Sequence, residues 1–165
     1  MKDFGLLLGI ALVGAALIVG LLLGSSDRPP VLAPDFTLEN LDGEAVTLSS
    51  YLGQVVIIDF WATWCKPCLT SFPALHELVV QHEEEGVVLL VVSIDKSLRK
   101  PRNYLIEQGY PTANVLWGSL DEARAVKDLY GVVGIPQTFI IDREGYIQFK
   151  GHPTRITAED LAAYL

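Results

Sequence analysis

The chain contains two cysteines, Cys65 and Cys68, within the sequence Trp64-Cys65-Lys66-Pro67-Cys68. They follow a β-branched run and open a segment of helical pattern, so we expect both at the start of a helix. Cysteines at this spacing can close a disulfide, and unpaired amides at a helix N-terminus stabilise a thiolate on the first one. With the charge of Lys66, this predicts a pKa for the Cys65 thiol below its free value of about 8.5. The predicted chemistry is thiol–disulfide exchange, with Cys65 attacking and Cys68 resolving the mixed disulfide.

The same spacing occurs in zinc knuckles and in inert structural disulfides, so the spacing alone leaves both alternatives open. A zinc site needs two further ligands, and His76, His82 and His152 show no matching pair spacing. The position at a helix start, in a chain without other cysteines, favours a redox role. We therefore predict no metal and no cofactor, because the cysteine pair itself is the redox centre.

The elements that must position this pair alternate between buried strands and amphipathic helices. Residues 55–60 form a continuous apolar and β-branched run interrupted only by Asp59, as expected of a strand buried on both faces. This alternation, with a hairpin near each end, predicts an α/β sandwich with a mixed sheet. The predicted order is a hairpin (36–38 and 44–48), a strand (55–60), a helix (65–84), a strand (87–94), a helix (101–108), a strand (114–117), a helix (121–130), a hairpin (137–141 and 146–150) and a final helix (157–165).

Length and charge limit the function classes. The chain has 165 residues, which corresponds to one domain with little beyond an appendage. Its net charge of −8 leaves no surplus of basic residues to neutralise phosphates, so nucleic acid is not an expected partner.

The appendage is an uncharged apolar run from Phe4 to Gly24. As a helix this run would be roughly 30 Å long, about the thickness of a bilayer core. We predict an N-terminal transmembrane anchor over residues 1–24, a proline-containing linker over 25–34 and a globular domain over 35–165. A cleaved signal ending near Ser26 and a buried core helix are the alternatives. The positive charge of Lys2 places the N-terminus in the cytoplasm and the domain on the extracytoplasmic side.

Three segments of the chain resemble one family. They are residues 59–68 (DFWATWCKPC), residues 33–38 (APDFTL) followed by Leu41-Asp42-Gly43, and residues 130–142 (YGVVGIPQTFIID). Together they are similar to the membrane-anchored TlpA/ResA-like thiol-disulfide oxidoreductases of the thioredoxin superfamily. The resemblance implies a thioredoxin-like three-layer sandwich with a central mixed sheet. It also implies an N-terminal β-hairpin extension and a helix–strand–helix inserted before a cis-proline.

The resemblance assigns roles to individual residues. Pro136 matches the cis-proline opposite the cysteine pair, and the backbone of Ile135 would pair with a substrate strand. From the sequence alone, Pro136 is equally a proline at the entry of a strand. The residues expected to face substrate are Trp64, Lys66, Pro67 and Ile135.

Asp59 matches the buried acid that thioredoxins carry six positions before the first cysteine. A carboxyl inside an apolar strand is desolvated, which raises its pKa and allows it to take a proton from the resolving thiol. The alternative is a solvated carboxylate at the end of a strand.

The function that the resemblance implies is reduction of disulfides in exported proteins, on the periplasmic side of the inner membrane. A membrane thiol-reductase would regenerate the dithiol. Apocytochrome c is a candidate substrate, although cytochrome c maturation members usually carry a glutamate where this chain has Ser71.

Three other functions are alternatives to reduction. A disulfide-forming oxidant is favoured by Lys66, whose charge stabilises the reduced form of the couple. A peroxidase of the peroxiredoxin type would need proline and threonine where the chain has Ile58 and Ala62. Copper delivery would use a C-x-x-x-C pair with a distal histidine, for which His152 is the candidate.

Overall fold

The structure is a computed structural model that describes residues 30–165. The predicted anchor and most of the predicted linker lie outside these residues. Within residues 30–165, none of the helices has both the length and the apolar character needed to cross a bilayer.

The described residues form a mixed sheet of eight strands in the order β1-β8-β7-β4-β5-β6-β2-β3. β4 runs parallel to β5, and β5 runs parallel to β6, whereas the remaining neighbours are antiparallel. The strands are β1 (Val31–Leu32), β2 (Thr37–Asn40), β3 (Ala45–Thr47), β4 (Val55–Trp61), β5 (Val87–Ser93), β6 (Val115–Trp117), β7 (Gln137–Ile141) and β8 (Tyr146–Gly151). The helices are α2 (Lys66–Gln81), α3 (Arg99–Gln108), α4 (Leu120–Leu129) and α5 (Ala158–Ala162), with short 3-10 turns η1 (Leu48–Tyr51), η2 (Glu83–Glu85) and η3 (Pro153–Arg155).

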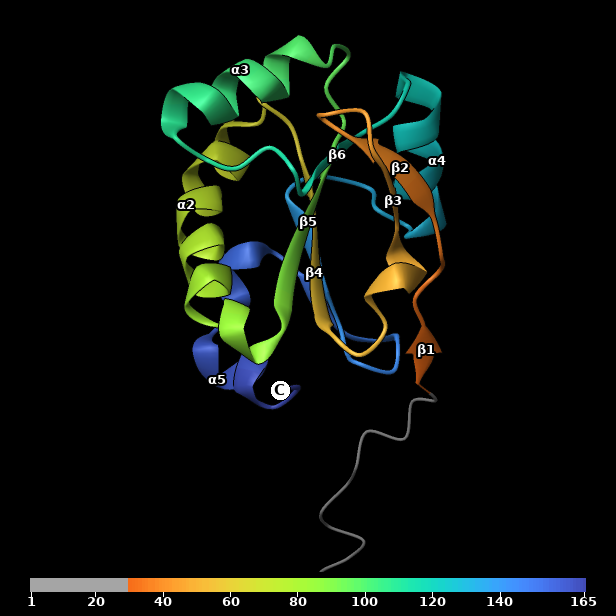
Figure 1. The fold of residues 1–165 in the computed structure, drawn as a ribbon, viewed down its shortest axis with the longest axis vertical. Coiled ribbons are helices and arrows are strands. Elements are labelled where there is room, and N and C mark those ends of the chain that lie inside the picture. The colour runs from red at the N-terminus through yellow and green to blue at the C-terminus, as the bar shows by residue number, and fades with distance from the viewer. Residues whose placement is uncertain (1–29) are drawn as a thin grey trace, which may run out of the picture.

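Helices cover the sheet on both faces, which gives three layers (Figure 1). α2, α3 and α5 pack on one face, and α4 packs on the other beside the β2–β3 hairpin. Side chains of β4 alternate between the two apolar clusters, because successive residues of a strand point to opposite faces. All seven residues of β4 are buried, as the β-branched run predicts.

The chain therefore has the thioredoxin-like α/β fold that the resemblance implies. The N-terminal hairpin β2–β3 extends the sheet beyond β6, and α3, β6 and α4 form the helix–strand–helix before β7. The final hairpin, β7–β8, turns through Asp142–Gly145 as predicted, with Gly145 at a φ of +91° that favours glycine.

The structure differs most from the sequence-based elements at three places. Val31 and Leu32, placed in the linker by the sequence, pair with Ile147 and Tyr146 as β1. A strand of two residues is too short to carry an alternating pattern, so it depends on its partner strand. The sheet thus begins a few residues before the predicted domain boundary at residue 35.

The other two differences are helix ends. The predicted helix 65–84 ends at Gln81 and is followed by η2, and the predicted final helix 157–165 ends at Ala162. The capping box of Thr157 and Asp160 is present at the start of α5. Beyond this helix, Tyr164 and Leu165 pack against the apolar cluster that also contains residues of α2.

Candidate active site

The two cysteines lie at the start of α2, shortly after the end of β4. Cys65 and Cys68 are joined by a disulfide, and Cys65 is the N-cap residue of α2. The backbone N–H of Cys68 donates a hydrogen bond to Cys65 Sγ over 3.3 Å. Pro67 in the first turn has no N–H to satisfy, which suits a helix start. The sulfur of Cys65 therefore lies at the positive end of the helix, where an anion is stabilised.

The two cysteine residues differ in access to solvent. Cys65 is 5% exposed and Cys68 is fully buried. Trp64, directly before Cys65, is 60% exposed, and Lys66 and Pro67 are exposed as well. An incoming disulfide therefore meets Cys65 first, with these three side chains around it.

Asp59 lies in the middle of the buried strand, on the face that α2 covers. Ile57 and Trp61, two residues to either side, belong to the apolar cluster that also contains Cys68. Thr138 on the neighbouring strand β7 donates its hydroxyl to Asp59 Oδ1 over 2.7 Å. Burial raises the pKa of Asp59 to about 7, although the Thr138 hydrogen bond lowers it. The carboxyl can therefore accept or release a proton near neutral pH.

The Ile135–Pro136 peptide bond is cis, as the resemblance implies. Gln137 pairs with Phe60, so Pro136 lies level with the end of β4 from which the cysteine loop departs. Ile135 is half-buried and packs against both apolar clusters. The segment before it carries Val133, which is 97% exposed and which the sequence analysis did not single out. An apolar side chain this exposed beside the cis-proline is available to a bound protein.

Sequence reasoning also missed a second buried carboxylate, Asp95, which holds the loop before Cys65. Asp95 Oδ2 accepts the backbone N–H of Thr63 over 2.9 Å, and Oδ1 accepts the Thr63 hydroxyl over 2.7 Å. The Ser93 hydroxyl donates to Oδ2 over 3.2 Å. The parallel pairing of β4 and β5 brings polar residues at their carboxyl ends to one edge of the sheet, and that pairing is not visible in the sequence alone.

The histidines and Ser71 stay outside this constellation. Ser71 donates its hydroxyl to the Pro67 carbonyl over 3.0 Å, within α2. His152 caps η3 by accepting the N–H of Thr154. Across residues 30–165, histidine, cysteine and acidic side chains nowhere gather in the groups of three that a metal ion requires.

A helix-capping cysteine disulfide beside a cis-proline, on a thioredoxin-like sheet, defines the class of thiol-disulfide oxidoreductases. The comparisons with known proteins agree. The chain is 31% identical over 137 residues to the thiol-disulfide oxidoreductase ResA of Bacillus thuringiensis subsp. konkukian (strain 97-27), covering 81% of this chain and 74% of the relative. The AhpC/TSA family matches residues 31–150. The chain belongs to this family and is a thiol-disulfide oxidoreductase of the ResA/DsbE type.

Solved structures lead to the same class. A crystal structure from Chlorobium tepidum, of a protein assigned as the thiol:disulfide interchange protein DsbE, superposes with a TM-score of 0.72 at 30% identity. The match covers 83% of this chain and 97% of that one. The thioredoxin domain of a thiol-disulfide oxidoreductase from Bacteroides vulgatus superposes with a TM-score of 0.70 at 26% identity, covering 84% and 95%.

Proposed function

We propose that the protein acts as a reductant of disulfides in exported proteins. The observation that carries the proposal is Asp59, a buried acid with a pKa of about 7 on the strand face that packs against Cys68. A dithiol donor must lose a proton from its buried second thiol. Asp59 can take this proton, because it lies on that strand face and its pKa is near neutral pH.

The reaction proceeds in two exchanges. The Cys65 thiolate attacks one sulfur of the substrate disulfide, a new S–S bond forms, and the other substrate sulfur leaves as a thiolate. Cys68 then transfers its proton to Asp59 and attacks Cys65 Sγ, which releases the second substrate sulfur. Two electrons pass from the dithiol to the substrate, whose thiolates take up protons, and the Cys65–Cys68 disulfide forms.

The surface around Cys65 provides a place for the substrate chain. In this proposal Trp64, Lys66 and Pro67 contact the substrate around its disulfide. The backbone beside Ile135 pairs with an extended substrate segment, and Val133 adds an apolar contact. Recognition of backbone by backbone suits an enzyme that acts on more than one protein.

The cellular part of the proposal follows from the sequence outside the described residues. The run from Phe4 to Gly24 anchors the protein in the inner membrane and leaves residues 30–165 on the periplasmic side. A membrane thiol-reductase restores the dithiol after each turnover. Apocytochrome c is one candidate among the substrates, with Asp59 supplying the acid–base function that Ser71 lacks.

The reduction potential of the Cys65–Cys68 couple tests the proposed direction. The full-length protein in detergent is equilibrated with glutathione buffers, and the fraction of disulfide is measured by thiol alkylation. A potential near or below about −270 mV supports the reductant. A potential near about −120 mV instead identifies an oxidant.

The oxidant is the second candidate function, and Lys66 is the observation that favours it. Its exposed ammonium group directly follows the attacking cysteine, and a positive charge there stabilises the thiolate and thus the reduced form. Measuring the potential of Lys66→Gln alongside the native protein separates this contribution. We expect the variant to be more reducing.

A further inference from the structure

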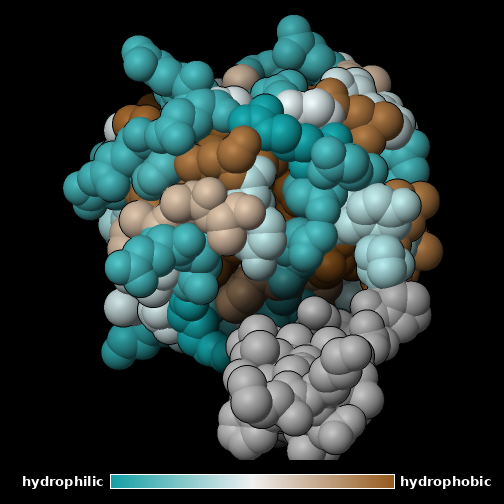
Figure 2. Space-filling model, turned by 90° about the horizontal axis from the view of Figure 1, so that it is seen from below, coloured by the Kyte–Doolittle hydropathy of each residue, from teal (hydrophilic) through white to brown (hydrophobic). Residues whose placement is uncertain are grey.

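The end of the domain opposite the disulfide carries an exposed apolar surface. Val31, Leu32 and Leu52 are large apolar residues on it that remain more than half exposed. β1, which carries Val31 and Leu32, lies at the lower end of the molecule in Figure 1. Seen from below, hydrophobic areas lie among hydrophilic residues on this face (Figure 2). We call Val31, Leu32, Leu52 and the pocket behind them the foot surface.

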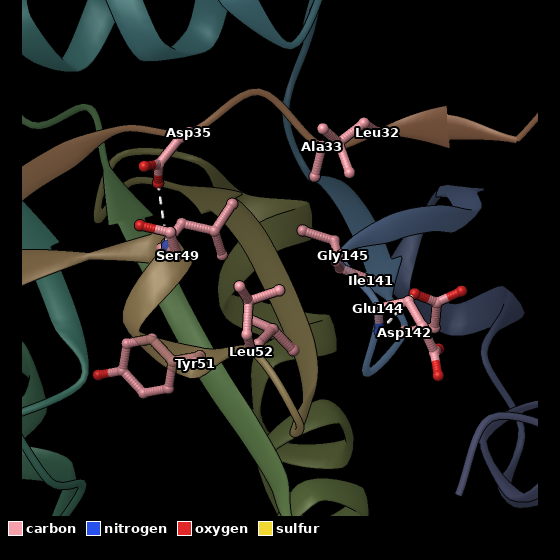
Figure 3. Close-up of a pocket in the computed structure, with 12 residues that line it drawn as sticks. Leu32, Ala33, Asp35, Ser49, Tyr51, Leu52, Ile141, Asp142, Glu144 and Gly145 are labelled. Carbon is pink, nitrogen blue, oxygen red and sulfur yellow. Dashed lines mark hydrogen bonds between the residues drawn. The ribbon is translucent and has the colours of Figure 1, made fainter.

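Leu32 and Leu52 converge although they are twenty residues apart in the chain. A Cβ atom built on Gly145 would lie 3.3 Å from Leu52 Cδ2 and 3.6 Å from Leu32 Cδ1, so both side chains flank this glycine. Behind them is a pocket of about 200 Å³ whose walls are mostly apolar and include Val56 and Ile141. Figure 3 shows β1 and the β7–β8 turn on one side of this pocket and η1 with Leu52 on the other.

Hydrogen bonds hold the foot surface in one arrangement. The Arg143 guanidinium donates to the carbonyls of Gly53 over 2.8 Å, Glu85 over 2.9 Å and Leu165 over 3.1 Å. The N–H of Gly53 in turn donates to the Arg143 carbonyl over 2.9 Å. Arg143 thereby ties the β7–β8 turn to the loop that presents Leu52, to the end of η2 and to the C-terminal residue.

The charged side chains that line the pocket are acidic, and two of the three accept backbone hydrogen bonds. Asp35 accepts the backbone N–H groups of Phe36 and Ser49, and Asp142 accepts those of Glu144 and Tyr146. The Glu144 side chain is exposed. A partner for this face is therefore apolar and without a strong negative charge.

The chain outside the described residues indicates which partner this is. The apolar run ends at Gly24, and only the six residues 25–30 separate it from Val31. Six extended residues span at most about 20 Å, so a membrane-embedded run keeps the foot surface close to the lipid. The seven residues of β4 hold the disulfide end about 20 Å further away.

We propose that the foot surface rests on the bilayer, with Leu32 and Leu52 reaching the boundary between headgroups and acyl chains. This inference rests on the membrane anchor of the proposed function. Tethering makes even a small apolar contact effective, because it raises the local concentration of lipid. The contact fixes the orientation of the domain, so that Cys65 and the cis-proline segment point away from the membrane toward exported substrates.

Tryptophan fluorescence in brominated lipid tests the proposal on the full-length chain. Leu52→Trp places a reporter on the foot surface, and Ile106→Trp on α3 is the matched control. The two positions are 63% and 62% exposed, and α3 lies at the opposite end of the molecule (Figure 1). Each variant is reconstituted in phosphatidylcholine vesicles with plain or brominated acyl chains, and the wild-type signal is subtracted. Reduction of insulin disulfides by each variant shows that the domain is folded.

We expect bromine to quench most of the fluorescence added at position 52 and little of that added at position 106. No quenching at position 52, or equal quenching at both positions, overturns the proposal. Washing the vesicles with alkaline carbonate distinguishes failure of the membrane anchor from failure of the docking. A chain that resists the wash while position 52 stays bright retains the anchor and loses the docking. A chain that is stripped from the vesicles overturns both.

Discussion

Asp59 and Asp95 are two carboxylates with the same burial and opposite surroundings. Each is 1% exposed; Asp59 lies in β4, and Asp95 lies two residues after the end of β5, the neighbouring parallel strand. Asp59 sits among apolar side chains, and its carboxyl accepts a hydrogen bond from the Thr138 hydroxyl. Asp95 receives hydrogen bonds from the backbone N–H and hydroxyl of Thr63 and from the Ser93 hydroxyl.

The difference shows how the number of donors decides what a buried acid can do. With one donor, burial dominates and the pKa of Asp59 rises to about 7, within reach of a proton transfer. With three donors, the carboxylate of Asp95 serves as a fixed acceptor that holds the loop before Cys65. Asp59 is therefore placed to exchange a proton, whereas Asp95 is placed to hold the loop that leads to Cys65.

The largest expected effect is on stability. In the folded protein burial raises the pKa of Asp59 to about 7, against about 3.9 for an aspartate in an unfolded chain. As pH rises through this window the unfolded state ionises first, so the native protein loses stability, by about 4 kcal/mol in total. Asp59→Asn removes this loss. In denaturant unfolding of residues 30–165, the variant should have the same free energy of unfolding as the native protein near pH 4. At pH 8 its free energy of unfolding should be higher by nearly that amount. An equal increase at both pH values contradicts the raised pKa.

The next effect is on the resolving step. Asp59→Asn cannot take the Cys68 proton, so we expect closure of the protein disulfide to slow by about 100-fold at pH 7. The native rate should inflect near pH 7, and the variant should lack this inflection. Rapid-mixing measurements of substrate thiol release, with Asp95→Asn as the matched control, separate the two acids. If Asp95→Asn lost the inflection as well, the distinction between them would fail.

A smaller effect is expected when the fixed acceptor is removed. Asp95→Ala leaves the Thr63 N–H without its partner, which should cost about 2 kcal/mol of unfolding free energy. Asp95→Asn keeps an acceptor and should recover part of the loss. Both are measured by denaturant unfolding. An unchanged free energy of unfolding in Asp95→Ala would show that the loop does not depend on this acid.

The smallest effect is a shift in the titration of Asp59. Thr138→Val keeps the shape of the side chain and removes the hydrogen bond that lowers the pKa of Asp59. The inflection of the resolving rate should move to higher pH, with a stability cost of about 1 kcal/mol. An unchanged inflection would mean that Thr138 has no influence on the carboxyl.

Asp59 was predictable from the sequence and Asp95 was not, for a physical reason. A single acid inside a β-branched run is visible as a desolvated carboxyl before any fold is known. The role of Asp95 depends on the parallel pairing that sets Trp61 opposite Ser93, and the sequence does not state that pairing. The same holds for β1, whose two residues become a strand only beside β8.

The predictable parts were those with a local cause. The β-branched run required a buried strand, and the cysteine pair required a helix start. The capping residues Thr157 and Asp160 marked the start of α5 correctly. Its end was not marked locally, and the residues beyond it, Tyr164 and Leu165, make tertiary contacts with the apolar cluster.

Trapping of the mixed disulfide tests the assignment of Cys65 as the attacking sulfur most directly. The full-length variants Cys68→Ser and Cys65→Ser are reduced, mixed with oxidised insulin at neutral pH and analysed by mass spectrometry. The difference in exposure predicts that Cys68→Ser rapidly forms a covalent adduct through Cys65, and that Cys65→Ser, left with a fully buried sulfur, forms almost none. Equal or faster adduct formation through Cys68 would contradict the account.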